Sequence, residues 1–340
     1  MPQPKTPVIH QTDLFHPHND PDDHWDLACQ YALAAMGDID LRGILLDYPV
    51  RADYGDPAIQ AVNQLNYIAN LAVPTAIGLP EKVSDTAAVD RMLAEGKGLS
   101  GVEMVLDILA RSAEPVVIHI VGSSRDIAAA AHKNPSLFRD KCKALYLNAG
   151  ASNPKSPIEY NVELDPFTYS MMFRLPCPVY WMPCFDMLSD TCTIGEFGTF
   201  YRFAQSEILP ALSPAMQKFF VYALARSTDS RWLSALTDPL NEAQLRQVSK
   251  YDRNMWCTGG FLHTAGLTVW RDGSIAPLGA SPAKEVFRFE PIQISCADDG
   301  ATDWTLTDAP TNRYIFRILN TKQYQSAMTA AMRTLLQRLP

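Results

Sequence analysis

Short β-branched runs alternate with helical patterns along the first half of this chain, and this alternation constrains the fold more than any other feature. The run PVVIHIVG (115–122) has the length and composition of a buried strand, whereas GVEMVLDILARS (101–112) places apolar residues at helical spacing. Strands that alternate with helices pair in parallel through right-handed crossovers, and helices then cover both faces of the sheet. We therefore expect an α/β fold with an open, mostly parallel, Rossmann-like sheet. The predicted strands are 7–12, 42–47, 73–78, 115–122, 143–150 and 177–183.

The second half departs from this alternation. From about 197 to 250 the pattern is helical, and a mixed part with strand-like pieces follows over about 256–340 and ends in a helical pattern. No stretch rich in Gly, Ser or Pro is long enough to act as a linker, and no internal repeat is visible. We predict a single domain over residues 1–340.

Composition and charge narrow the class of function. No apolar run approaches the roughly 20 residues of a membrane span, and a formal net charge of −8 without a basic cluster disfavours nucleic acid as a partner. The seven cysteines are scattered without a Cys-x-x-Cys pair, which favours a reducing compartment over a disulfide framework. No signal-peptide pattern is visible, so we expect a cytoplasmic protein. Because the charge disfavours nucleic acid, we expect its ligand to be a small molecule.

A stretch rich in aspartate and histidine, VIHQTDLFHPHNDPDDHWDLA (8–28), lies where the first predicted strand ends and a helix begins. Carboxylates this close together are either solvated or held by a cation or a proton, because like charges repel. Several of them together can supply the 6 to 8 oxygen ligands that Ca²⁺ prefers, although acids are also common at a helix N-terminus. The imidazoles offer a second chemistry, because histidines with an aspartate bind Zn²⁺. The residues concerned are Asp13, Asp20, Asp22, Asp23, Asp26, His16, His18 and His24.

The motifs of this chain resemble, in order and spacing, those of the nucleoside hydrolases (inosine-uridine-preferring N-ribohydrolases). That family carries Asp-Thr-Asp-Pro-Gly-x-Asp-Asp, and an Asn followed six residues later by Glu-Phe-Asn. Here TD ends the first strand, PDDHWDLA opens the first helix, and Asn153 precedes the EYN of 159–161 by six residues. The resemblance covers about residues 7–190. It implies the family's fold, hydrolysis of the N-glycosidic bond of a ribonucleoside or a related glycoside, a Ca²⁺ cofactor and a homo-oligomer.

The resemblance also implies residues for the metal and the attacking water. Asp13 matches the aspartate that binds calcium and acts as base toward the water, and Asp23 matches a second calcium ligand. Val121 matches the residue whose backbone carbonyl completes the metal site. The loop after Asp13 is longer here than in the family, so Asp20 or Asn19 is an alternative ligand.

Further residues are implied for the substrate. Asp22 matches a neighbour that binds ribose hydroxyls, and Asn153, Glu159 and Asn161 match other residues that bind the sugar. His263 falls near the family histidine that protonates the leaving base, with a satisfied core histidine as the alternative. Four aromatic residues are candidates for stacking on the base, although burial in the core is the commoner outcome: Trp181, Phe185, Trp256 and Phe261.

One departure from the family pattern favours a divergent member. The family aspartate that follows its histidine and binds calcium corresponds here to Thr264, and the loss of an anionic ligand should weaken calcium binding. Two alternatives to a calcium-dependent hydrolase therefore stand. One is a carbohydrate-binding relative that does not hydrolyse its ligand, and the other is a zinc hydrolase that uses His16, His18 and Asp20.

Overall fold

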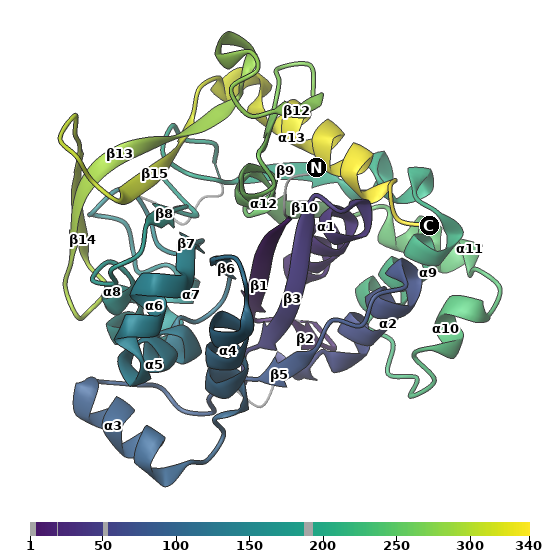
Figure 1. Cartoon of the computed structure of the whole chain (residues 1–340). Helices are drawn as coiled ribbons and strands as arrows, with labels where there is room; N and C mark the ends of the chain where they lie inside the picture. The colour runs from purple at the N-terminus through teal and green to yellow at the C-terminus, as the bar shows by residue number, and fades with distance from the viewer. Residues whose placement is uncertain (1–4, 19, 50–53, 187–192) are drawn as a thin grey trace.

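A nine-stranded mixed sheet forms the centre of the molecule (Figure 1). The structure is a computed structural model that describes residues 5–18, 20–49, 54–186 and 193–340. The strands of the sheet are β1 (Thr6–Thr12), β3 (Ile39–Leu46), β5 (Thr75–Ile77), β6 (Val116–Ile120), β7 (Cys142–Leu147), β8 (Val179–Trp181), β13 (Phe287–Cys296), β14 (Thr302–Leu306) and β15 (Arg313–Ile318). Their order is β14-β13-β15-β8-β7-β6-β1-β3-β5. From β15 to β5 neighbouring strands are parallel, whereas β13 and β14 add antiparallel pairs at one edge.

In the part of the chain that the structure describes, three two-stranded sheets lie outside the main one. They pair β2 (Phe15–His16) with β4 (Asp56–Pro57), β9 (Tyr201–Ala204) with β10 (Asp252–Met255), and β11 (Leu267–Val269) with β12 (Ile275–Pro277). The first of these fixes the chain between β1 and the first helix, because β2 follows β1 directly.

Helices cover both faces of the main sheet, and each face has its own apolar cluster. Residues of α1, α2, α9, α12 and α13 belong to one cluster, and residues of α3, α4, α5, α6 and α8 belong to the other. No helix in the described ranges has the length and apolarity needed to cross a membrane. The helices are α1 (Asp22–Met36), α2 (Ile59–Ala69), α3 (Thr86–Glu95), α4 (Ser100–Arg111), α5 (Arg125–Lys133), α6 (Pro135–Lys141), α7 (Tyr160–Leu164), α8 (Pro166–Met172), α9 (Pro214–Leu224), α10 (Ser234–Thr237), α11 (Glu242–Val248), α12 (Thr258–Thr264) and α13 (Thr321–Leu336).

The predicted fold class is confirmed. Each of the predicted strands appears within a few residues of its expected range, as β1, β3, β5, β6, β7 and β8. The prediction of a helical pattern from about 197 was wrong at its start, because 201–204 is a strand. There Tyr201 and Phe203 are buried while Arg202 is exposed, so the true period is two rather than 3.6.

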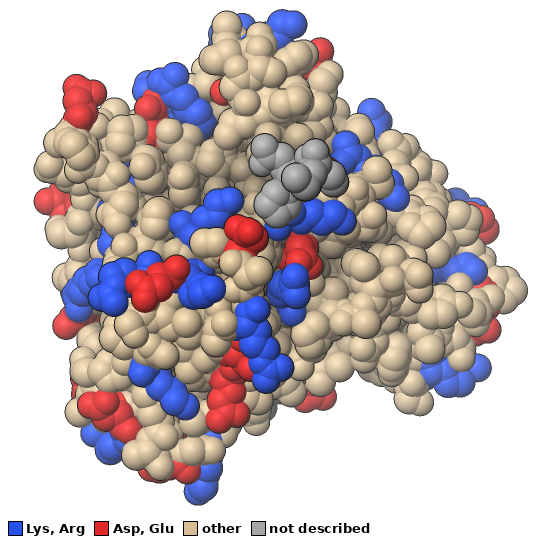
Figure 2. Space-filling model, in the orientation of Figure 1, with Lys and Arg blue, Asp and Glu red and all other residues tan. Residues whose placement is uncertain are grey.

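The charged side chains on the face shown in Figure 2 are mixed in sign, with acidic side chains among the basic ones. Acidic side chains also gather below the surface, at the start of α1. Two aspartates form the first turn of that helix, and Gly37 ends it with a positive φ of 78°. An acidic first turn is favoured by the helix dipole, but it also brings like charges close together.

Candidate active site

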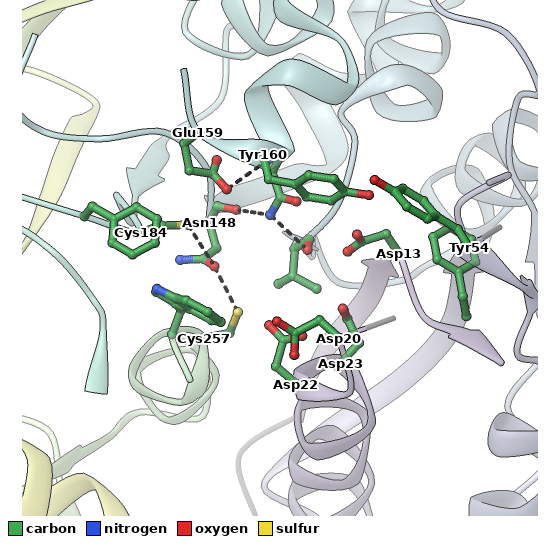
Figure 3. A pocket seen from close by; sticks show the side chains of 15 residues that line it. Asp13, Asp20, Asp22, Asp23, Tyr54, Asn148, Glu159, Tyr160, Cys184 and Cys257 are labelled. Carbon is green, nitrogen blue, oxygen red and sulfur yellow. Dashed lines mark hydrogen bonds between the residues drawn. The ribbon is translucent and has the colours of Figure 1, made fainter. Parts of the chain in front are cut away.

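A cavity of about 340 Å³ lies beyond the carboxyl ends of β1, β6, β7 and β8 (Figure 3). This is the edge at which open α/β sheets bind their ligands, because the crossovers leave a crevice there. Acidic and aromatic side chains form much of its wall. The residues that line it are Asp13, Phe15, Asp20, Asp22, Asp23, Tyr54, Val121, Asn148, Glu159, Tyr160, Asn161, Cys184, Phe185, Trp256 and Cys257.

One wall of the cavity is acidic. Asp13 directly follows β1, and Asp22 and Asp23 occupy the first turn of α1. The Asp23 carboxylate accepts a hydrogen bond from the Thr12 hydroxyl, which fixes its orientation. Asp20 differs from the other three, because its carboxylate lies 2.5 Å from an Arg253 guanidinium nitrogen and its side chain is 58% exposed. The predicted ligand Asp20 therefore belongs to the rim and has a cationic partner, and Asn19 lies outside the described residues.

Negative charge on the acidic wall is disfavoured by its surroundings. Burial raises the pKa of Asp13 to about 8, and the neighbouring Asp47 and Glu159 carboxylates add to this shift. Burial, followed by repulsion from nearby aspartates, also raises the pKa of Asp22 and Asp23 well above the usual range. Near neutral pH this wall therefore favours the binding of a proton or a cation. As the side chains stand, no three His, Cys, Asp or Glu residues in the described part of the chain are grouped so as to hold a metal ion.

The opposite wall is built from a short loop and the start of α7. Glu159 precedes this helix, and its two carboxylate oxygens accept hydrogen bonds from the Asn161 amide at 3.0 Å and the Gly150 amide at 2.7 Å. The Asn161 side chain donates its Nδ2 to the carbonyls of Val121, at 3.2 Å, and Asn148, at 3.1 Å. These bonds hold Glu159 and Asn161 in one orientation before any ligand arrives. The Asn161 Oδ1 is left free to accept a hydrogen bond from a ligand.

Six lining residues were not predicted: Phe15, Tyr54, Asn148, Tyr160, Cys184 and Cys257. Three of them form one hydrogen-bonded group around Asn148. The Asn148 amide nitrogen donates to the Met182 carbonyl at 2.8 Å and the Thr199 hydroxyl at 3.1 Å. Its Oδ1 accepts from the thiols of Cys257, at 3.1 Å, and Cys184, at 3.7 Å. Asn148 directly follows β7, so the rule that ligands bind at strand ends could have found it. The two thiols carried no such signal, because scattered cysteines are usually structural.

Aromatic side chains complete the cavity. Phe185 and Trp256 meet edge to face, with ring centroids 6.0 Å apart and planes at 85°. The rings of Tyr54 and Tyr160 lie 6.2 Å apart in a tilted arrangement. A planar, partly apolar ligand group would find aromatic faces here. Two other predicted stacking candidates lie in the core instead: Trp181 and Phe261.

His263, predicted to act as acid toward the leaving group, is not among the described residues that line the cavity. Its Nδ1 lies 2.6 Å from the Tyr146 hydroxyl, and burial lowers its pKa to about 4, so it is a half-buried histidine that is neutral near pH 7. The physical reason is its place in α12, because this helix starts at the cavity and His263 lies near its far end. Thr264, expected at the position of a metal ligand, instead bonds the His119 ring nitrogen at 2.9 Å. The two residues just before this helix, Trp256 and Cys257, line the cavity.

Asn153, predicted to contact the sugar, is also not among the described residues that line this cavity. Its Oδ1 accepts from the Lys155 amide at 3.0 Å, so the side chain stabilises a turn. It lines a separate pocket of about 180 Å³, although Glu159 lines both.

We expect His263→Phe to leave ligand binding and turnover unchanged while it lowers the free energy of unfolding by about 1–2 kcal/mol, because the Tyr146 hydroxyl loses its buried partner. Thermal unfolding and steady-state kinetics of the variant would measure both effects. A large loss of kcat without a change in Tm would restore the catalytic role of His263.

The comparisons with known proteins concern the fold. No protein-family model and no curated protein sequence matches this chain. Solved structures do match over almost the whole length. The inosine-uridine preferring nucleoside hydrolase of Bacillus anthracis shares 11% identity at a TM-score of 0.51, over 98% of this chain and 100% of that one. The plant nucleoside hydrolase PpNRh1 shares 12% identity at a TM-score of 0.54, over 98% and 99%.

A third match is an effector protein. The type III effector protein XopQ, solved in complex with adenosine diphosphate ribose, shares 14% identity at a TM-score of 0.51, over 98% of this chain and 95% of that one. The strand order, the cavity at the strand ends and these matches agree with one another. The chain therefore has the fold of the nucleoside hydrolases.

Proposed function

We propose that this protein is a divalent-cation-dependent hydrolase of the N-glycosidic bond of ribonucleosides or closely related glycosides. One observation carries the proposal. The acidic wall of Asp13, Asp22 and Asp23 faces Glu159 across a single cavity at the strand ends (Figure 3), and Asn161 lines the same cavity. The names of matching structures support it, because two are nucleoside hydrolases and a third was solved with adenosine diphosphate ribose.

The donor set fits a hard cation such as Ca²⁺. Asp13, Asp22 and Asp23 line the cavity, and Ca²⁺ takes carboxylate and carbonyl oxygen ligands in flexible geometry. Val121 lines the cavity too, and its carbonyl would be shared between the ion and the Asn161 side chain. The raised pKa values of the three carboxylates support a cation among them, because positive charge would relieve their repulsion. Binding requires these side chains to move together, since they are not grouped for an ion as they stand. When bound, the cation would lower the pKa of a water molecule in the cavity.

Different residues that line the cavity would then have different roles in hydrolysis. Cleavage of an N-glycosidic bond passes through a sugar cation, which a nucleophilic water attacks from one face. Asp13 would accept the proton of that water as general base. Glu159 and Asn161, already fixed by backbone hydrogen bonds, would bind the sugar hydroxyls and hold the ring in register. Aromatic faces at Phe185 and Trp256 would receive the base.

A second candidate function is binding of a riboside without hydrolysis. It is favoured by one observation, which is that no histidine is among the described residues that line the cavity. A departing base needs a proton or an equivalent electrostatic partner, and His263, predicted to supply it, lies elsewhere.

The test is to incubate the protein with a panel of purine and pyrimidine ribonucleosides, in calcium or in EDTA, and to measure reducing sugar. The proposal predicts sugar release in calcium that EDTA abolishes. Binding of nucleosides in calcium without any sugar release would select the second candidate. If the protein neither binds a nucleoside nor releases sugar, both candidate functions are contradicted.

Two asparagines give a matched pair of variants for this assay. Asn161→Ala should lower kcat/KM by about 100-fold, because its carboxamide lies in the cavity and is oriented by two carbonyls. Asn153→Ala should leave kcat/KM unchanged, because that side chain serves a turn outside the cavity. Equal losses in the two variants would show that the cavity does not hold the sugar.

A further inference from the structure

The charge of the large cavity is of one sign. Five carboxyl groups line it, and none of the described residues that line it is Lys, Arg or His. Asp20, at the rim, has a cationic partner in Arg253, 2.5 Å away. Within the described ranges, no ion pair joins the acidic wall or Glu159 to a Lys or Arg side chain. Electrostatics in this cavity therefore favour a positively charged ligand over an anionic one.

A bound Ca²⁺ ion would reduce this negative charge without cancelling it. The acidic wall has three carboxylates, which exceed the two charges of one ion, and Glu159 lies on the opposite wall (Figure 3). The Glu159 carboxylate accepts hydrogen bonds from two uncharged backbone amides, at 3.0 and 2.7 Å. Burial raises the pKa of this carboxyl group, so a cation beside it would favour its ionised form. The preference for positive charge therefore remains in the calcium-loaded protein.

The aromatic end of the cavity suits a positively charged ring. Phe185 and Trp256 both line it, and their rings meet edge to face with centroids 6.0 Å apart. The face of an aromatic ring carries negative partial charge and attracts a cation, and the indole of Trp is the most effective in this respect. A flat cationic ring would gain both apolar contact and electrostatic attraction here.

The polar groups next to this aromatic end are poor acids. Cys184 and Cys257 are the chain neighbours of the two aromatic residues, and both thiols donate to the same side-chain amide oxygen. Burial raises the pKa of both thiols well above the usual range, so they keep their protons. The phenols of Tyr54 and Tyr160 lie toward Asp13 instead, on the side opposite the thiols (Figure 3). No described lining residue is thus placed to protonate a base held at the aromatic end.

We propose that this cavity is specific for N-ribosides whose base carries a positive charge, such as a pyridinium riboside; the proposal rests on the hydrolase function proposed above. A neutral base that receives no proton departs with the bonding electrons as an anion, which the surrounding carboxyl groups repel. A cationic base departs with the same electron pair as a neutral molecule, because the pair cancels the charge on the ring nitrogen.

Hydrolysis of such a riboside needs no acid at the leaving group. The C1′–N bond breaks and its electron pair goes to the ring nitrogen. The oxygen of the attacking water binds C1′, and the water releases one proton, which Asp13 accepts. The products are ribose, a neutral base and one proton, and no oxidant or second substrate takes part. The lack of an acid at the aromatic end is therefore compatible with turnover of a cationic substrate.

The test compares ribosides that differ in the charge of the base, with the full chain in calcium at pH 6. Nicotinamide riboside and 7-methylguanosine are cationic, and uridine and guanosine are their neutral counterparts. Release of sugar should give a kcat/KM about 100-fold higher or more for each cationic riboside. Because a cationic base is also the better leaving group, calorimetry measures binding separately. 1-Methylnicotinamide, a cation without a sugar, should bind about 10-fold more tightly than neutral nicotinamide.

Variants identify the side chains that distinguish the charge. Trp256→Leu should lower the ratio of kcat/KM for nicotinamide riboside to that for uridine by about 10-fold, because leucine has no aromatic face. Glu159→Gln should lower the same ratio by a similar factor, since weaker sugar binding affects both substrates equally. Trp256→Leu serves alone if Glu159→Gln does not fold. Glu163→Gln is the matched control and should keep the ratio, because Glu163 lies in the same segment but is exposed.

The outcomes separate this proposal from the hydrolase function. Cleavage of uridine and guanosine as efficient as that of the cationic ribosides, with equal binding of 1-methylnicotinamide and nicotinamide, would overturn the charge specificity and leave the hydrolase function standing. An unchanged ratio in Trp256→Leu and Glu159→Gln would also overturn it. Tighter binding of the cationic ribosides without any release of sugar would support the specificity and contradict the hydrolase function.

Discussion

Asp13→Asn is expected to lower the kcat of nucleoside hydrolysis by about 1,000-fold, because the amide cannot accept the proton of the attacking water. The substitution keeps the size and shape of a side chain that directly follows β1. Steady-state release of reducing sugar at saturating calcium would measure the effect. Asp20→Asn is the matched control, since Asp20 lies at the rim and is paired with Arg253. Equal losses in the two variants would remove Asp13 from the role of base.

The same variant has an expected effect on stability. The pKa of Asp13 is about 8 in the folded protein and 3.8 as a free side chain, so the folded state holds its proton more tightly. Without a divalent cation, the free energy of unfolding should therefore fall as the pH rises from about 4 to 8. Asp13→Asn removes this loss, so at pH 8 in EDTA it should be more stable than the wild type by about 1–3 kcal/mol. Urea denaturation at pH 5 and pH 8 would show this, and a less stable variant at pH 8 would contradict it.

Asp23→Asn is expected to abolish both calcium binding and hydrolysis while it keeps the fold. A cation at 100 times its dissociation constant stabilises a protein by about 2.7 kcal/mol, and this gain should disappear in the variant. The fold should persist because the asparagine oxygen can still accept the hydrogen bond of the Thr12 hydroxyl. Thermal unfolding with calcium and with EDTA would measure the difference.

Asn153→Ala is the control for this measurement of calcium-dependent thermal unfolding. Asn153→Ala leaves the acidic wall untouched and should show the full calcium-dependent rise in Tm. If Asp23→Asn shows the same rise as the wild type, calcium binds elsewhere or the acidic wall does not need a cation.

The strands and helices could be predicted from the sequence where the pattern of apolar residues was long and regular. Strands such as β6, which is buried along its whole length, appear as continuous apolar runs, and the helices between them show a clear spacing. Shorter elements were not readable. The strand β9 has only Tyr201–Ala204 to display its alternation, and it pairs with β10 far along the chain. Such a pairing depends on tertiary contacts rather than on local sequence.

The candidate site was readable only in part, for a related reason. Asp13, Asp22 and Asp23 lie close together in the chain, and Glu159 and Asn161 are neighbours in a short motif, so local sequence pointed to both walls. The wall formed by the start of α12 could not be derived in this way. The packing of a short helix decides which of its ends reaches the cavity. The prediction placed His263 at the cavity, whereas Cys257, at the start of the helix, lines it.

Calorimetric titration of the wild-type protein with Ca²⁺, in the presence and absence of free ribose, tests the central claim most directly. We expect one calcium ion per chain and binding of ribose that depends on that ion, because the acidic wall and the pair of Glu159 and Asn161 line one cavity. Ribose that binds equally well in EDTA, with no heat from calcium alone, would contradict it.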